Sequence, residues 1–552
     1  MQKLDVETVH RITSRNKLRQ YASPKKGRAR ILPFAQPRMR PGAELAPEAS
    51  FFVGGSCFAR NIERALAFGG LPVLSSSEGT PMPSPPGQIA KWFNKFNTDT
   101  LLNEMRWAVQ PEDDFGVRTL VEFEGEFSDL QIGWSFAHEQ EQAEFLRRAY
   151  CGAYSGASEA DVVVITLGSI ECWYDCEQQI YLNGMVPGRV SERMPGRFEF
   201  HSFDFEDAYA SLQRVYDHIM ARPGKKPVLV FAVSAVAQPA TYGAEDALVS
   251  NMASQAIQRA AAEQFVREHE DCWYFPAYEY CLLSDRKFSY HKNTFNHVQQ
   301  PVMDRAVANM LEALQGPSEV QSIIAVRGLV ADHNTAGDPE KSLAAVEKHD
   351  ETYGDSAGLD VVRAQTFAAH DRHEAALPYY MRAAQSEKFG TYSLWSTAVS
   401  AALRCKRPEL AAEVVAIAEE RGDDPERLEA LKERAAAAPV IAAAPVLQDP
   451  GVPQLPRDEL VRIHDTYKEL LGSDPQRVVD ELGEMLDEGR ISDDRFVWLY
   501  ARALTKTDVP QAIVYLRELC AGDFKYMASA ENTLNNLIAR QQRLGRAGCH
   551  DR

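Results

Sequence analysis

The sequence of 552 residues lacks the features of a membrane protein or of a disulfide-rich secreted protein. No stretch approaches the roughly 18 continuous apolar residues that a transmembrane helix needs. The first 30 residues contain no apolar core of a secretory signal. The nine cysteines are scattered without paired spacing, and their number is odd. This pattern favours reduced thiols over a disulfide framework, so we expect a cytoplasmic protein without a membrane span.

The sequence also has no excess of positive charge outside its first 50 residues. Lysine and arginine total 60 against 78 aspartates and glutamates, for a net charge of −18. Residues 1–50 carry eleven Lys/Arg against four Asp/Glu, so this arm is at +7 and the rest of the chain at −25. An acidic body argues against a nucleic-acid partner. The basic stretch 25–40 could contact a phosphate or an anionic surface, or be a solvated arm wrapped on the next domain.

Residues 51–316 alternate between strand-like and helix-like patterns. Apolar runs at 51–54, 161–167 and 227–233, with a weaker one at 272–275, are typical of strands buried on both faces of a parallel sheet. Amphipathic helical patterns lie at 57–68, 136–150, 205–221, 246–269 and 302–314. The alternation predicts a doubly wound α/β domain, in which ligands bind beyond the carboxyl ends of the strands.

After residue 316 the strand patterns end and alanine-rich helical patterns repeat. Glu340, Glu374 and Glu409 begin similar four-residue segments, 34 and 35 residues apart. This period resembles that of tetratricopeptide repeats, and a generic helical bundle is the alternative. Helical stacks of this kind usually bind a protein partner. The predicted organisation is a basic arm (1–50), an α/β domain (51–316), TPR-like helical repeats (317–434), an Ala/Pro-rich linker (435–456) and a C-terminal helical region (457–552).

The segment Gly55-Ser56-Cys57-Phe58-Ala59 follows the first predicted strand and opens the first helix. Glycine permits a tight turn there. Ser56 is then at the strand's carboxyl end and at the helix N-terminus, where N–H groups and the helix dipole favour an anion. A hydroxyl in this position can act as a nucleophile, or it can merely cap the helix. Cys57 is the less favoured alternative: its thiol is intrinsically more nucleophilic than a hydroxyl, but as the first helical residue it is expected to point into the sheet. A phosphate loop is excluded because GxxxxGK[ST] is absent.

These residues and several downstream segments resemble the GSCFA family. The resemblance covers about residues 50–315 and includes Thr166-Leu167-Gly168-Ser169-Ile170-Glu171-Cys172-Trp173-Tyr174-Asp175, Val233-Ser234-Ala235-Val236, Tyr274-Phe275-Pro276-Ala277-Tyr278-Glu279 and His297. The family looks like a bacterial branch of the SGNH (GDSL-like) hydrolases. The resemblance therefore implies a three-layer α/β/α fold and hydrolysis or transfer of acyl groups. It implies Ser56 as nucleophile and His297 as general base, and an acylated sugar or polysaccharide as substrate.

The sequence departs from the superfamily pattern around the base and the oxyanion site. Thr294 stands three residues before His297, where the superfamily has Asp, and the nearest carboxylate upstream is Asp285. Asn293, one residue before Thr294, could orient the imidazole instead, and a Ser–His dyad oriented by a backbone carbonyl is the alternative. A neutral Asn would stabilise the imidazolium less than a carboxylate does. The superfamily's Asn oxyanion donor is also missing. The candidate residues for oxyanion stabilisation and substrate contact are therefore Gly55, Asn97, Gly168, Glu171, Trp173 and Ser234. The backbone N–H groups of Ser56 and Gly168 are further candidate donors to the oxyanion.

Two functions follow from these features. The first is an SGNH-like serine hydrolase or O-acyltransferase that acts on acylated carbohydrate. The second is a catalytically weakened sugar-binding scaffold whose helical repeats dock a partner from polysaccharide biosynthesis. We expect neither a cofactor nor a metal, because Cys172-x3-Cys176 lacks a second pair of ligands.

Overall fold

The computed structural model describes most of the chain and forms two compact units, Met1–Ala398 and Val399–Arg552. The described residues are 3–22, 30–43, 45–75, 93–110, 116–132, 137–224, 226–291, 296–335, 338–370, 372–387, 389–422 and 425–436, with shorter stretches between 463 and 534. None of the helices in these ranges is long and apolar enough to cross a bilayer.

A four-stranded parallel sheet forms the centre of the first unit. Its strands are β1 (Phe51–Gly55), β5 (Val162–Leu167), β9 (Val228–Val233) and β10 (Cys272–Tyr274), in the order β1-β5-β9-β10. An isolated parallel bridge joins Phe51 to Val73 on the other side of β1. All residues of β1 and β5 are buried, as expected for continuous apolar runs in a parallel sheet. The predicted α/β class and parallel sheet are confirmed.

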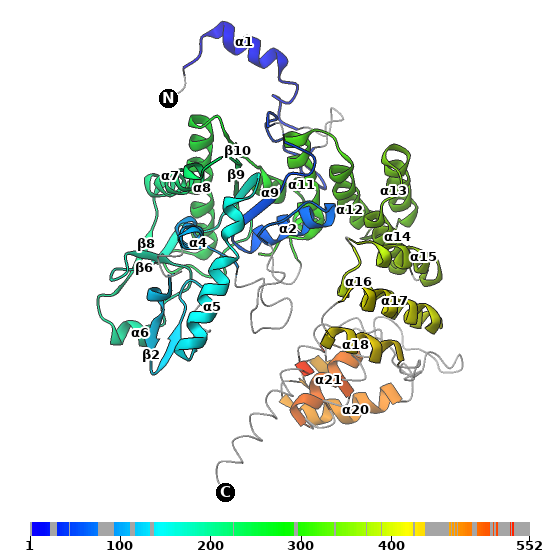
Figure 1. The fold of residues 1–552 in the computed structure, drawn as a ribbon. Helices are drawn as coiled ribbons and strands as arrows, with labels where there is room; N and C mark the ends of the chain where they lie inside the picture. Colours follow the sequence, from blue (N-terminus) through cyan, green and yellow to red (C-terminus); the bar gives the residue numbers. More distant parts are fainter. Residues whose placement is uncertain are drawn as a thin grey trace. The chain divides into compact units, whose positions relative to one another are not determined.

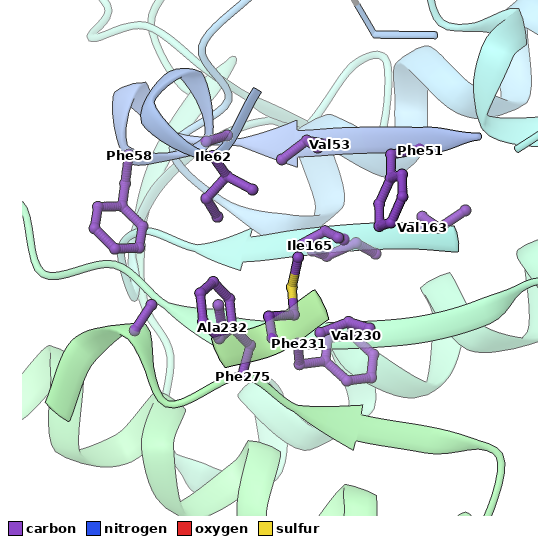
Figure 2. Close-up of a cluster of buried hydrophobic side chains, with 14 of the residues drawn as sticks. Phe51, Val53, Phe58, Ile62, Val163, Ile165, Val230, Phe231, Ala232 and Phe275 are labelled. Atoms are coloured by element: carbon purple, nitrogen blue, oxygen red, sulfur yellow. The ribbon is translucent and has the colours of Figure 1, made fainter. Parts of the chain in front are cut away.

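Helices cover both faces of this sheet (Figure 1). On one side lie α2 (Cys57–Gly69), α9 (Ala277–Leu283) and α11 (Gln300–Gln315), and on the other α7 (Phe205–Ala221) and α8 (Ala247–Glu268). Figure 2 shows how Phe58 and Ile62 of α2 approach the buried side chains Ile165 and Phe231 of the sheet. These packed layers fix the position of every strand end.

Two small antiparallel sheets, which the sequence did not predict, flank the parallel sheet. One consists of β2 (Val121–Phe123), β3 (Glu126–Ser128) and β4 (Ala137–His138), and the other has the order β7 (Ile180–Leu182), β6 (Glu171–Asp175), β8 (Phe198–Ser202). The remaining short elements are α4 (Thr98–Val109), α5 (Gln140–Gly152), a 3-10 helix (Ser155–Ser158), α6 (Gly188–Arg193) and α10 (Arg286–Ser289).

The chain beyond residue 316 is helical in all its described parts, which confirms the predicted helical region. Its helices are α12 (Glu319–Thr335), α13 (Pro339–Tyr353), α14 (Ala357–Ala369), α15 (His373–Gln385), α16 (Tyr392–Arg404), α17 (Pro408–Glu420), α18 (Pro425–Ala436), α20 (Pro475–Asp487) and α21 (Asp494–Thr507). The small side chains of Ser342, Ala376 and Ala411 are fully buried. The TPR-like character of these helices stays a prediction. Residues 437–456 of the predicted linker lie outside the described residues.

Helix α12 packs directly on the α/β part. Ile324 of α12 is fully buried and belongs to the same core as the parallel strands. The Arg327 guanidinium lies 3.9 Å from the centre of the Phe68 ring on α2. The domain boundaries drawn from the sequence stay predictions, but residue 316 does not mark the edge of this core.

Part of the basic arm is also packed. Phe34 and Met39 are buried, and the backbone N–H of Met39 donates to Asn309 Oδ1 at 3.3 Å. Arg38 forms an ion pair of 2.6 Å with Glu312 of α11. By contrast, α1 (Val6–Arg15) buries none of its residues. Residues 33–39 are therefore packed on the α/β part, as expected of an arm wrapped on the next domain.

Candidate functional site

Ser56 occupies the turn between β1 and α2. Its backbone is extended, and its Oγ accepts a hydrogen bond from the Phe58 N–H at 3.3 Å, so Ser56 does cap α2. The turn requires glycine at the preceding position. Gly55 has a φ of +122°, and a Cβ there would lie 2.3 Å from the carbonyl oxygen of Thr166. The capping role predicted for Ser56 is therefore present, and it leaves the hydroxyl proton available to another acceptor.

That acceptor is Ser234, which follows β9. The Ser56 hydroxyl donates to Ser234 Oγ at 3.2 Å, and both side chains are buried. Ser234 Oγ also accepts from the Val236 N–H at 3.2 Å. The backbone N–H of Ser56, one of the expected oxyanion donors, instead donates to Thr166 Oγ1 at 3.2 Å. Two of the predicted site residues, Ser56 and Ser234, are thus in direct contact at the carboxyl edge of the sheet.

This contact lies at the switch point of the sheet topology. From β1 the chain first bridges outward to Val73 and later returns to β5 on the other side. Ligands of open α/β sheets bind where the strand order reverses in this way, beyond the carboxyl ends. Ser56 follows β1 and Gly168 follows β5, so both predicted residues stand at this edge.

The segment 93–97 closes one side of the site. The Lys95 N–H donates to the Gly55 carbonyl at 2.7 Å, and the Ser169 N–H donates to the Phe96 carbonyl at 2.7 Å. A Cβ on Gly168 would lie 2.4 Å from that same Phe96 oxygen. The segment therefore bridges the ends of β1 and β5, and this close approach explains the glycine at 168.

Asn97 caps a helix in the structure. Its Oδ1 accepts from the Thr100 N–H at 2.9 Å at the start of α4, and its Nδ2 donates to the Leu182 carbonyl at 3.4 Å. Both ends of the amide are thus occupied by contacts other than Ser56. The predicted use of Asn97 as an oxyanion donor would require it to leave the Leu182 carbonyl.

Glu171 holds a loop in place. Its carboxylate accepts from the hydroxyl groups of Thr241 and Ser250 and from the Tyr242 N–H. These contacts occupy the carboxylate that the sequence analysis proposes as a substrate contact. Trp173, two residues on, packs against the rings of Phe200 at 5.7 Å and Tyr242 at 5.4 Å. Phe200 and Tyr242 are 36% and 47% exposed, so this ring cluster reaches the surface.

His297 lies in a loop attached to the same edge of the sheet. Val298 pairs with Tyr290, whose hydroxyl donates to the Ala235 carbonyl at 3.2 Å, one residue after Ser234. The His297 side chain is exposed, and its Nδ1 lies 2.8 Å from Asn296 Oδ1. Within the described residues, no hydrogen bond joins His297 to Ser56. Asn293, the predicted orienting residue, lies outside the described residues.

Cys57 is a poor competitor for Ser56. Burial raises the pKa of its thiol above the ordinary value, and Arg60 offsets only part of this effect. A buried thiol with a raised pKa carries little thiolate at neutral pH, and the thiolate is the nucleophilic form. The site chemistry therefore centres on the Ser56 hydroxyl.

Comparison with known protein families finds a match over the α/β part of the chain. Residues 50–309 match the GSCFA family. No curated protein and no solved structure matches the chain. The GSCFA match contains the whole parallel sheet, Ser56, Gly168, Ser234 and His297, and it ends inside α11.

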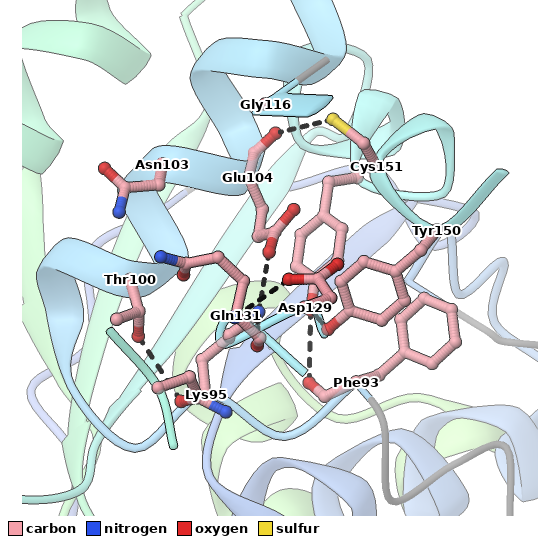
Figure 3. A network of polar contacts seen from close by, with 12 residues as sticks. Phe93, Lys95, Thr100, Asn103, Glu104, Gly116, Asp129, Gln131, Tyr150 and Cys151 are labelled. Carbon is pink, nitrogen blue, oxygen red and sulfur yellow. Dashed lines mark hydrogen bonds and ion pairs between the residues drawn. The ribbon is translucent and has the colours of Figure 1, made fainter. Parts of the chain in front are cut away.

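Figure 3 shows a buried polar network in the α/β part of the chain that sequence reasoning missed. The Lys95 ammonium donates to Glu104 Oε1 at 2.6 Å and to the Gln131 carbonyl. Arg147 pairs with the other oxygen of Glu104 and, at 2.9 Å, with Asp129. The side chains of Lys95, Glu104 and Arg147 are completely buried. Burial lowers the pKa of Lys95, and the Glu104 carboxylate opposes this shift.

The network fixes the segment that borders Ser56. The Lys95 side chain is anchored in the network while its backbone N–H holds the Gly55 carbonyl. Its members come from positions 95, 104, 129, 131 and 147, and this irregular spacing forms no motif that could be recognised in the sequence. The only hint in the sequence is the placement of Lys95 within the aromatic stretch Trp92-Phe93-Asn94-Lys95-Phe96.

Proposed function

We propose that the GSCFA domain is an SGNH-like serine hydrolase or O-acyltransferase with Ser56 as its nucleophile. The observation that carries this proposal is the position of the Ser56 hydroxyl, at the carboxyl end of β1, at the switch point of the sheet and at the N-terminus of α2. The N-terminus of α2 adds a positive dipole end beside this oxygen. Such an end stabilises the negative charge that develops when a hydroxyl attacks an acyl carbonyl.

In this mechanism the Ser56 Oγ attacks the acyl carbonyl and passes its proton to His297. His297 then protonates the leaving oxygen, and it later deprotonates the water or sugar hydroxyl that resolves the acyl-enzyme. His297 must leave Asn296 and reach Ser56 for this step. The pairing of Val298 with Tyr290, which is itself hydrogen-bonded to the Ala235 carbonyl, keeps His297 at the edge of the sheet that carries Ser234.

The exposed rings of Phe200 and Tyr242 support a carbohydrate as the acyl carrier. They surround Trp173 on the sheet that leaves the carboxyl end of β5. Flat rings of this kind pack against the apolar C–H faces of sugars. The helical region would then dock a protein partner.

Labelling with a fluorophosphonate probe tests the nucleophile without knowledge of the substrate. We expect mass spectrometry to find the label on Ser56 and to find none in Ser56→Ala. Ser234→Ala, the matched control at the contacting hydroxyl, should keep the label. His297→Gln should slow labelling by about a hundredfold, the usual scale of general-base catalysis.

The second candidate is a sugar-binding scaffold, and the exposed His297, bonded to Asn296 rather than Ser56, favours it. The two candidates give opposite results in one assay. If the wild-type protein takes no label and hydrolyses acetylated sugars no faster than Ser56→Ala, the scaffold is the correct function and Ser56 only caps α2.

A further inference from the structure

A cavity lies where the basic arm meets the parallel sheet, and the proposed chemistry at Ser56 does not use it. Its volume is about 400 Å³, within the range of small-molecule sites. Four segments line it: residues 37–40 of the arm, α8, β10, and the start of α9. The buried side chain of Met39 and the Arg38–Glu312 ion pair hold the arm in position.

The lining of this cavity is positively charged although the chain as a whole is at −18. Four arginines line it against two glutamates: Arg38, Arg40, Arg259 and Arg267 against Glu263 and Glu279. Both glutamates are already paired, Glu263 with Arg259 and Arg267 and Glu279 with Arg259. Glu312, outside the lining, offsets part of the charge of Arg38. The lining therefore carries between one and two positive charges in excess.

Arg40 is the arginine left without a carboxylate. It is exposed and forms no ion pair with any residue that the structure describes. Its guanidinium lies 6.0 Å from the centre of the Trp273 ring. Trp273 and Tyr274 line the cavity beside it, and the Tyr274 ring is covered on one face by Arg259 at 3.9 Å.

We propose that this cavity binds a soluble small molecule that carries a phosphate monoester next to a planar ring. A phosphate monoester has a charge between about −1.5 and −2 at pH 7, which matches the excess of the lining better than a single carboxylate. The guanidinium of Arg40 can donate two parallel hydrogen bonds to the phosphate oxygens of such a group. The ring of the ligand packs against Trp273, whose indole lines the same cavity.

Calorimetric titration of the full chain with matched probes tests this assignment. Uridine 5′-monophosphate and adenosine 5′-monophosphate carry both groups, uridine carries the ring alone, and ribose 5-phosphate carries the phosphate without a base. We expect saturable binding of both nucleotides with a Kd below about 1 mM. Ribose 5-phosphate should bind about tenfold more weakly and uridine at least tenfold more weakly, since each lacks one contact.

Substitution of Arg40 locates the binding. Because Arg40 is exposed, Arg40→Gln should fold normally and raise the nucleotide Kd at least tenfold, while Arg40→Lys should lose less. Arg189→Gln, at an exposed arginine of α6, is the control and should bind like the wild type. Failure of both nucleotides to bind at about 10 mM overturns the assignment. So does equal affinity for uridine and its monophosphate, or unchanged binding by Arg40→Gln.

Discussion

Ser56 combines two roles in one oxygen, since its lone pair accepts from the Phe58 N–H while its proton goes to Ser234. The capping contact fixes the position of the oxygen at the helix N-terminus. The contact to Ser234 fixes the direction of the proton. A nucleophilic Ser56 has to redirect this proton to His297, so the bond to Ser234 competes with activation rather than assisting it.

Close backbone approach at Gly168 is the residue-scale requirement that can be tested most directly. Gly168→Ala would place its Cβ 2.4 Å from the Phe96 carbonyl, and backbone atoms cannot yield as side chains do. We expect a loss of about 1–3 kcal/mol in the free energy of unfolding, the cost typical of overpacking. Urea denaturation followed by circular dichroism measures it.

Gly152→Ala is the matched control for this substitution. Gly152 is the last residue of α5, and no atom lies within 4 Å of an added Cβ. Alanine should leave stability unchanged or raise it there, because it reduces the conformational freedom of the unfolded chain. Equal effects of the two substitutions would show that the contact between Gly168 and Phe96 does not constrain the site.

At the scale of elements, the sequence predicted the strands and helices that form continuous or regularly spaced apolar runs. Strands β1, β5 and β9 were found because their residues are buried on both faces, and α7 because its buried residues form one stripe. The pattern of β10 was weaker because two of its three residues are only half-buried. The small antiparallel sheets were missed because their strands are two to five residues long and mix buried with exposed positions. The site was predictable to the same extent: Ser56, Gly168 and Ser234 each follow a readable strand. The Lys95 network was not, since it joins segments with no common period.

The buried network should contribute strongly to stability as a balanced set of charges. Lys95→Met removes one of two cations and leaves the carboxylates of Glu104 and Asp129 with Arg147 alone. Breaking a buried pair in this way costs about 3–5 kcal/mol. The double variant Lys95→Met/Glu104→Gln restores the balance, so it should be more stable than Lys95→Met alone.

An exposed ion pair provides the comparison for this network. Lys341 pairs with Asp338 at 2.7 Å, but the lysine side chain is 70% exposed. Lys341→Met should therefore change the free energy of unfolding by less than about 1 kcal/mol in the same urea titration. The charge-balance argument fails if the double variant is less stable than Lys95→Met.

On the scale of the whole molecule, the family match, the core and the compact units end at different residues. The GSCFA match ends at residue 309, whereas the core of the parallel sheet includes Ile324. The first compact unit continues to Ala398. Composition revealed the change from α/β to all-α sequence at residue 316. Composition could not reveal that α12 completes the core. That packing depends on which side chains of α2 and α12 fit together, and a helical hydrophobic pattern does not specify this.

Truncation of the chain tests how much of the helical region the α/β part needs for its stability. A fragment of residues 1–407 keeps α12 to α16 and should retain the cooperative melting of the sheet core. A fragment of residues 1–316 exposes the surface of α2 that packs on Ile324 and Arg327, so it should melt at a lower temperature or aggregate. Equal melting temperatures of the two fragments would show that the α/β domain is complete at residue 316.

A substitution at the contact between α12 and the core makes the same test in the full chain. Ile324→Ala should lower the free energy of unfolding by about 2–5 kcal/mol, as expected for a fully buried side chain. Leu248→Ala, at a residue that is 79% exposed, should have almost no effect.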